Sequence, residues 1–269
     1  MIIINYVRFI IRCSMLAEFT FRTSIVIIWQ HILNKRIIYF NYKHYKLCIN
    51  NDSWSSVSYH ILNSVKKVEK LVDQIAYCSV AVDAGANNGW FSYFIKIKFP
   101  ESTVYVIEPS ESLQEVIKMN LANFTKCEIY KTAISNINSD IEMYINKKSQ
   151  QTNAVSIEML LGGSNLKKLT KDIIKEKVSC TTLDQLFQYK KMPDVLKVDI
   201  QGEEYNLLLG ATTVMPNVNI SFFEITLLDS KVFETVLLLK KYYRFNKVIN
   251  EIKMGADVMF YNNADILSS

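Results

Sequence analysis

The sequence has little of the residue types on which metal and disulfide chemistry depend. Its 269 residues include three histidines, which leave little material for a multi-histidine metal site or a Ser-His-Asp triad. The five cysteines are odd in number, and no two have C-x-x-C spacing. A disulfide framework or a zinc site is therefore not expected, and a reducing, cytoplasmic compartment fits this composition best. We predict no metal site.

A long apolar run is also absent. Within residues 1–36 the longest uncharged run, Thr23 to Asn34, is shorter than the roughly 20 residues that a membrane-spanning helix needs. No charged start followed by a cleavage site indicates a signal peptide. We expect a helical arm that covers the core of its own domain. Two alternatives stay open: an amphipathic segment in peripheral contact with a membrane surface, and an arm that buries itself in a homodimer.

Charge of one sign does not dominate. The chain has 31 basic and 26 acidic residues, a net charge of +5, and its lysines are scattered among acids. No Arg/Lys stretch is interleaved with stacking aromatics, so a nucleic-acid partner is not expected. The hydrophobic content of 49% is ordinary for a folded protein and allows a core of useful size.

Strand-like and helix-like segments alternate from about residue 78 onward. Such alternation predicts an α/β fold with a Rossmann-like, doubly wound, mostly parallel sheet. The chain end is expected to form two strands joined by a turn near Gly255. The expected strands are "SVAVDA", "STVYVIE", "CEIYKTAIS", "DVLKVDI" and "NISFFEIT", with helices such as "NGWFSYFIKIKF" and "SESLQEVIKMNLANF" between them.

The flanking segments suggest a simple division of the chain. Residues 37–50 alternate and are rich in Tyr and Ile, which predicts a hairpin. Residues 146–175 break the strand–helix rhythm and are expected to form an insertion. We therefore divide the chain into an N-terminal amphipathic arm and hairpin, residues 1–50, and one α/β domain, residues 51–269.

A glycine loop follows the first strand of this domain, in "VDAGANNGWF". A dinucleotide site would have a third glycine where Asn87 stands, and a P-loop would have a lysine after Gly89. Asp83 would repel a phosphate but attract an ammonium group. S-adenosylmethionine carries an ammonium and no phosphate, so we predict that Asp83, Gly85, Asn87 and Gly89 bind it.

A second acid supports this prediction. Glu108 ends the next strand, 25 residues after Asp83, where a carboxylate can accept hydrogen bonds from ribose hydroxyls. A nicotinamide-dependent oxidoreductase on a similar fold is the weaker alternative, because the middle glycine is missing.

The stretch "LKVDIQGEEYNLLLGA", from Leu196 to Ala211, resembles the hallmark of the FkbM family of methyltransferases. The resemblance covers roughly residues 78–226. Four further stretches agree with it: "VDAGANNGWFS", "TAIS", "TTLDQLF" and "FFEIT".

This resemblance implies a class I methyltransferase domain that uses S-adenosylmethionine for O-methylation of a small-molecule or glycan acceptor. The hydroxyl would belong to a sugar, a glycan or a secondary metabolite. Asp199 would bind the cofactor and also act as a base or as the group that orients the acceptor, with a helix N-cap as its alternative role. Glu204 and Glu224 are further candidate acceptor-site carboxylates, with a solvent-facing position as the alternative for Glu204 and a half-buried polar group as that for Glu224. Lys197 is expected on the opposite face of the strand.

One position departs from the family pattern. Gln201 stands where the family usually has Glu. A catalytic role of that Glu would be lost or moved to Glu203 or Glu204, whereas Gln201 could replace a Glu that only hydrogen-bonds the turn, since an amide also accepts. A non-catalytic, cofactor-binding partner subunit of a glycan assembly complex therefore stays open as an alternative. His44 and His60 are alternative bases, but each is expected to be a packed or surface residue.

Overall fold

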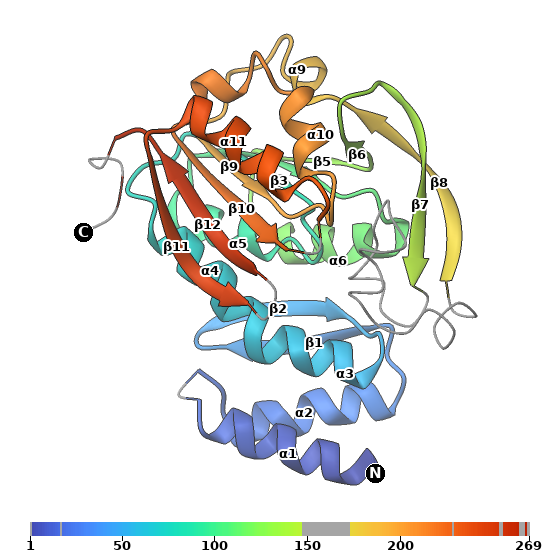
Figure 1. The fold of residues 1–269 in the computed structure, drawn as a ribbon. Coiled ribbons are helices and arrows are strands. Elements are labelled where there is room, and N and C mark those ends of the chain that lie inside the picture. The colour runs from blue at the N-terminus through green and yellow to red at the C-terminus, as the bar shows by residue number, and fades with distance from the viewer. Residues whose placement is uncertain are drawn as a thin grey trace.

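The computed structural model describes residues 2–16, 18–146, 173–227, 229–252, 255–263 and 267. Its centre is a seven-stranded sheet with the order β11-β12-β10-β9-β3-β4-β5 (Figure 1). β12 is antiparallel to both of its neighbours, and the remaining pairs are parallel. The predicted mostly parallel, Rossmann-like sheet is confirmed. Its strands are β3 (Val80–Ala84), β4 (Thr103–Ile107), β5 (Cys127–Tyr130), β9 (Val195–Val198), β10 (Ile220–Thr226), β11 (Phe245–Ile252) and β12 (Gly255–Tyr261).

Helices cover both faces of the sheet, because parallel strands need crossover connections. Alternate strand residues contribute to two different apolar cores. In β3, Ala81 packs in the core with α4, α5 and α6, whereas Val80 and Val82 pack in the core with α9, α10 and α11. The helices are α4 (Val65–Asp73), α5 (Trp90–Lys98), α6 (Glu111–Leu121), α9 (Leu183–Leu186), α10 (Glu204–Leu209) and α11 (Val232–Tyr242); a short 3₁₀ helix, η4 (Met215–Asn217), precedes β10.

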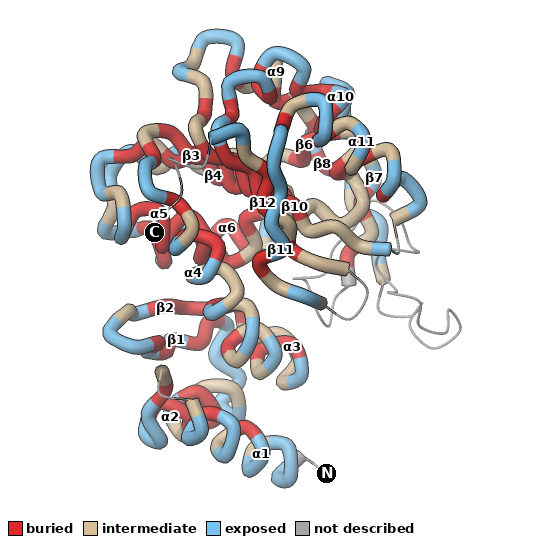
Figure 2. Tube along the Cα trace, turned by 60° about the vertical axis from the view of Figure 1, so that its left-hand side comes forward, coloured by how far each residue is buried: buried red, intermediate tan, exposed pale blue. Residues whose placement is uncertain are grey.

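The predicted hairpin over residues 37–50 is confirmed as β1 (Ile37–Tyr42) and β2 (Tyr45–Asn50). Two helices, α1 (Ile2–Ser14) and α2 (Phe21–Ile32), lie beyond it at the end of the molecule farthest from the central sheet (Figure 1). Figure 2 shows that each helix alternates between buried and exposed positions, and Phe9 and Ile27 are among the buried ones. The N-terminal arm is therefore helical and packs on its own hairpin.

A helical stretch with one irregular turn joins the hairpin to the sheet. It consists of α3 (Trp54–Tyr59), a π-helical turn η1 (His60–Ser64), and α4. Ser53 caps its start by accepting a hydrogen bond of 3.4 Å from the backbone N–H of Ser56. Single π turns widen a helix and occur frequently at functional sites.

The prediction of one strand over "CEIYKTAIS" is wrong. β5 ends at Tyr130, and the chain then leaves the central sheet to form β6 (Ala133–Ile134) in a separate three-stranded sheet of order β6-β8-β7. The Thr132 hydroxyl donates to the carbonyl of Ser179 in β8, which helps hold this departure. β7 (Ser139–Asn146) and β8 (Ile173–Thr181) flank the predicted insertion, most of which, residues 147–172, lies outside the described residues.

Among the described residues, no helix combines the length and the apolar character that a membrane span requires.

Candidate active site

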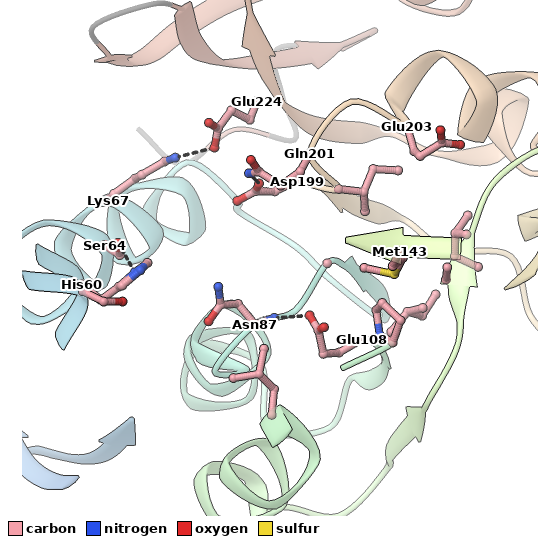
Figure 3. Close-up of a pocket in the computed structure, with 18 of the residues that line it drawn as sticks. His60, Ser64, Lys67, Asn87, Glu108, Met143, Asp199, Gln201, Glu203 and Glu224 are labelled. Carbon is pink, nitrogen blue, oxygen red and sulfur yellow. Dashed lines mark hydrogen bonds and ion pairs between the residues drawn. The ribbon is translucent and has the colours of Figure 1, made fainter. Parts of the chain in front are cut away.

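A cavity of about 590 Å³ lies at the carboxyl ends of the central strands (Figure 3). It is lined by residues that follow β3, β4 and β9. The strand order reverses between β3 and β9, and open α/β sheets bind ligands at such a switch point. The volume is in the range of small-molecule sites.

The glycine loop has a left-handed backbone at Gly85, Asn87 and Gly89, with φ values of 72°, 54° and 73°. The amides of Gly85 and Ala86 both donate to the carbonyl of Ile107, each at 3.0 Å, which ties the loop to the end of β4. Gly85 and Asn87 line the cavity, as expected of cofactor-binding residues. Gly89 is not among the lining residues; it is the N-cap of α5.

Glu108 is buried at the cavity wall beside this loop (Figure 3). One carboxylate oxygen accepts from the amide of Asn87 at 2.9 Å and the other from the amide of Ser110 at 3.0 Å. Burial raises the pKa of Glu108 to about 7. Each carboxylate oxygen has a second lone pair, so Glu108 can still accept from ribose hydroxyls.

The wall around Glu108 suits the rest of the cofactor. Apolar side chains adjoin the carboxylate, as an adenine ring requires. This part of the cavity combines the carboxylate of Glu108, backbone polar groups and apolar walls, and no lysine of the described residues lines it. Such a lining fits S-adenosylmethionine better than a phosphate-bearing ligand. The apolar members of this wall are Ile107, Pro109, Leu113, Ile134 and Met143.

Asp83 does not line the cavity, so the prediction that it contacts the cofactor needs correction. It is fully buried, and one oxygen accepts from both the amide and the hydroxyl of Ser92, at 3.2 and 2.7 Å. The other oxygen lies 3.3 Å from the ammonium of Lys197. The side chain thus holds the start of α5 in place.

The prediction that Lys197 lies on the face of β9 opposite the site is wrong. It stands next to Asp83 in the register of β3 and β9, so the two side chains meet. Its ammonium donates to the carbonyl of Gly85 at 2.6 Å and lies 3.8 Å from a carboxylate oxygen of Asp199. Lys197 therefore links the glycine loop to the end of β9.

Asp199 faces the cavity between the cofactor loop and α4 (Figure 3). Burial alone would raise the pKa of Asp199, but the charges of Lys197 and Lys67 lower it overall. The carboxyl is therefore ionised near neutral pH. Gln201, in a left-handed conformation with φ of 54°, donates from its amide to Asp199 at 2.9 Å. A Glu at this position could not make that bond when ionised, so Gln201 supports the carboxylate of Asp199.

Glu224 is the second carboxylate of this part of the cavity. Lys67 pairs with Glu224 at 3.0 Å and with Asp257 at 2.9 Å. The charge of Asp199, together with burial, raises the pKa of Glu224 to about 7. The structure brings Asp199 and Glu224 to one side of the cavity, and the acceptor-site role of both stays a prediction.

Glu204 is not in the cavity, which corrects its predicted role. It is buried and accepts from the amides of Ile200 and Gly202, at 3.2 and 2.9 Å. Burial raises the pKa of Glu204 to about 8. The side chain closes the turn after β9. Glu203 does line the cavity, where it accepts from the hydroxyl of Ser135 at 2.7 Å.

Sequence reasoning undervalued His60 and missed Lys67, which line the cavity from η1 and α4. His60 Nδ1 is 2.9 Å from the hydroxyl of Ser64 (Figure 3). Burial lowers the pKa of His60 to about 4, so its ring is neutral at pH 7. The signal was present: His60, Ser64 and Lys67 stand at i, i+4 and i+7, the spacing of one helix face.

In the described part of the chain, no group of three His, Cys, Asp or Glu side chains is placed to hold a metal ion.

The fold and the site together define a class I methyltransferase: a seven-stranded sheet with one antiparallel strand, and a glycine loop and an acid at its switch point. The profile of the methyltransferase FkbM domain matches residues 83–251, more than half of the chain. The chain therefore belongs to the FkbM family, and it is an S-adenosylmethionine-dependent methyltransferase.

Comparison with curated proteins finds no match. Among solved structures, the chain is similar to precorrin-6y C5,15-methyltransferase from Geobacter metallireducens, with 11% identity over 74% of this chain and 89% of that one, and a TM-score of 0.44. An rRNA methylase from Streptococcus thermophilus has 12% identity over 73% and 94%, with a TM-score of 0.42. The Pyrococcus abyssi tRNA (uracil-54, C5)-methyltransferase, in complex with S-adenosyl-L-homocysteine, has 13% identity over 84% and 44%, with a TM-score of 0.46. These likenesses carry no information on the acceptor of this chain.

Proposed function

We propose that the protein transfers the methyl group of S-adenosylmethionine to a hydroxyl of a sugar or glycan. The observation that carries this proposal is the polar part of the cavity lining, which is separate from Glu108 and the apolar residues around it. There α3 and its N-cap contribute hydroxyl groups, and the strand ends contribute two carboxylates. An acceptor with many hydroxyls would find both donors and acceptors on this surface, whereas an apolar acceptor would leave them unpaired. The hydroxyl-bearing residues are Ser53, Ser55, Ser56 and Tyr59.

Positioning supplies much of the rate in a displacement at a methyl carbon. When bound, S-adenosylmethionine supplies an electrophilic methyl group. In the proposed mechanism the ionised Asp199 accepts a hydrogen bond from the acceptor hydroxyl and orients its oxygen. The hydroxyl proton would move to the carboxylate pair of Asp199 and Glu224 as the new C–O bond forms and the methyl carbon–sulfur bond breaks, with S-adenosylhomocysteine as the leaving group. Because these two groups interact, the proton belongs to the pair and not to either one alone.

Lys67 has a supporting role in this mechanism. Its ion pairs with Glu224 and Asp257 keep positive charge close to both acceptor-site carboxylates. That charge favours the ionised forms, which accept hydrogen bonds. His60 lies at the same wall, and its neutral ring can exchange a hydrogen bond with the acceptor without adding a charge.

The test is a methyl-transfer assay with a panel of sugars and nucleotide sugars, in which released S-adenosylhomocysteine is measured and the product is mapped by mass spectrometry. Asp199→Asn is expected to lower kcat by roughly 100-fold or more, the usual contribution of a general base. Calorimetry should show that the variant still binds S-adenosylmethionine. Asp140→Asn is the matched control, because Asp140 is exposed on β7 and outside the cavity.

Methylation of nitrogen or carbon atoms, or full activity of Asp199→Asn, would contradict the proposal. Binding of the cofactor with no turnover on any hydroxyl acceptor would instead favour a non-catalytic partner subunit.

A further inference from the structure

Helices α1 and α2 present an unusual amount of apolar surface to solvent. Along α1, Ile3, Val7 and Ile11 stand at i, i+4 and i+8, and their exposed fractions are 76%, 49% and 52%. On α2, Trp29 and Ile32 are 57% and 53% exposed. Further exposed apolar residues on or next to these helices are Ile4, Met15, Phe21, Val26 and Leu33.

This apolar surface is not the side by which the helices pack on their own domain. The opposite side of α1 carries the buried Phe9 and Cys13, and that of α2 carries the buried Ile27. Tyr6 and Phe9 pack edge-on against Trp54, with ring centroids 4.7 and 4.9 Å apart. Each helix therefore has two apolar sides, one used by the fold and one facing outward (Figure 2).

Cations accompany the outward apolar surface. Residues 1–50 contain seven Lys and Arg residues and a single acid, Glu18, which pairs with Lys66 at 3.1 Å. The exposed Arg8, Arg12 and Arg22 form no ion pair with a carboxylate within the described residues. Arg36 and Lys43 pair with Glu115 and Glu69, at 3.0 and 2.7 Å. The positive charge on α1 and α2 that carboxylates of the described residues leave without an ion pair is therefore that of these three arginines.

We propose that α1 and α2 dock on the surface of an anionic lipid bilayer. Exposed apolar side chains with Arg and Lys around them match the boundary between acyl chains and anionic headgroups. Trp29 has the amphipathic ring that favours this boundary. A second copy of the chain fits less well, because a two-fold contact between these faces would bring two sets of unpaired cations together.

The experiment is sedimentation of the full chain with vesicles of phosphatidylcholine alone or mixed with phosphatidylglycerol. The protein is expected to bind the mixed vesicles more tightly, and less so at high salt. The emission of Trp29 should shift to shorter wavelength on binding. Trp29→Phe should abolish most of that shift and retain binding.

Two paired variants separate the apolar and the electrostatic contributions. Val7→Ser/Ile11→Ser should lower the partition coefficient about tenfold or more, because two apolar side chains no longer enter the bilayer. Arg8→Glu/Arg12→Glu should abolish the preference for anionic vesicles. Phe233→Ser/Leu237→Ser is the matched control: these residues have the same i, i+4 spacing on α11 and are 77% and 62% exposed.

Circular dichroism and urea unfolding verify that each variant is folded. Absence of binding to the mixed vesicles would overturn the proposal, as would an equal loss of binding in the α11 control. Light scattering tests whether a second copy of the chain occupies this surface instead. If the protein binds no vesicles but forms a dimer that Val7→Ser/Ile11→Ser dissociates, the surface belongs to the dimer contact.

Discussion

Gly85 and Gly89 adopt nearly the same left-handed conformation but differ in their surroundings. A Cβ atom at Gly85 would lie 1.9 Å from the carbonyl oxygen of Asp199. At Gly89 the nearest atom to such a Cβ is a side-chain carbon of Ile117, at an ordinary 3.4 Å. Glycine is therefore required at position 85 by both its positive φ and the close contact with the backbone of Asp199. At position 89 it is required by its positive φ alone.

This difference leads to a prediction for the two alanine variants. Gly89→Ala should lower the free energy of unfolding by about 1 kcal/mol, the usual penalty for a left-handed non-glycine residue. Gly85→Ala should lower it by about 3 kcal/mol or more, because the backbone at Asp199 must also move. Urea unfolding measures both values. Equal losses in the two variants would show that the contact with Asp199 is not rigid.

At the scale of elements, the hairpin of β1 and β2 depends on α6. A two-stranded hairpin is marginally stable by itself. Asn120 supports the outer edge of β2: its side chain accepts from the amide of Cys48 at 2.8 Å and donates to the carbonyl of Cys48 at 2.9 Å. The indole of Trp90 donates to the same carbonyl at 3.1 Å. These bonds join the N-terminal segment to the methyltransferase domain.

Asn120→Ala is expected to reduce the free energy of unfolding by about 2–3 kcal/mol, since it leaves buried backbone groups of β2 unpaired. The amide of Cys48 should also exchange its hydrogen faster. Asn123→Ala serves as the control, because Asn123 is exposed just beyond the same helix. Similar behaviour of the two variants would argue that the hairpin is held by apolar packing instead.

At the scale of the whole molecule, stability should depend on buried carboxyl groups. The pKa values of Glu108 and Glu224 are raised to about 7 and that of Glu204 to about 8, from an ordinary value of 4.5. Near neutral pH the folded protein therefore binds more protons than the unfolded chain, and its stability must fall as pH rises. His60 acts in the opposite sense, but mainly below pH 6.5, where the unfolded chain binds its proton.

We expect the free energy of unfolding to decrease by on the order of 1–2 kcal/mol between about pH 7 and 8. Glu204→Gln should flatten this dependence, because the group with the highest pKa of the three is removed. Glu111→Gln should not, because Glu111 is exposed and its pKa is lowered by a hydrogen bond from Lys131. Urea titrations at several pH values provide the measurement, and a stability that rises over this interval would contradict the sign.

The local patterns of the sequence were sufficient for the strand–helix order, the hairpin and the glycine loop. Hydrophobic periodicity reports which side of an element is buried, and a glycine loop after a buried strand reports a close approach of backbone. The positions of Gly85, Glu108 and Asp199 at the cavity followed, because the carboxyl ends of parallel strands meet at one edge of a sheet. The end of β5 at Tyr130 could not be predicted from these patterns, because a chain that passes from one sheet to another can keep the same alternation of apolar and polar residues.

Tertiary structure alone decided what the charged residues do. The register of β3 and β9 places Lys197 against Asp83, which turns a predicted ligand contact into an internal ion pair. The turn after β9 buries Glu204 on backbone amides. His60 and Lys67 enter the cavity because η1 and α4 pack beside the ends of β9 and β10, which lie far away in the chain. The sequence by itself determined which elements form, because hydrophobic periodicity and turn preferences are local. The pairing of charges depends on which distant elements become neighbours, and only the folded structure decides that.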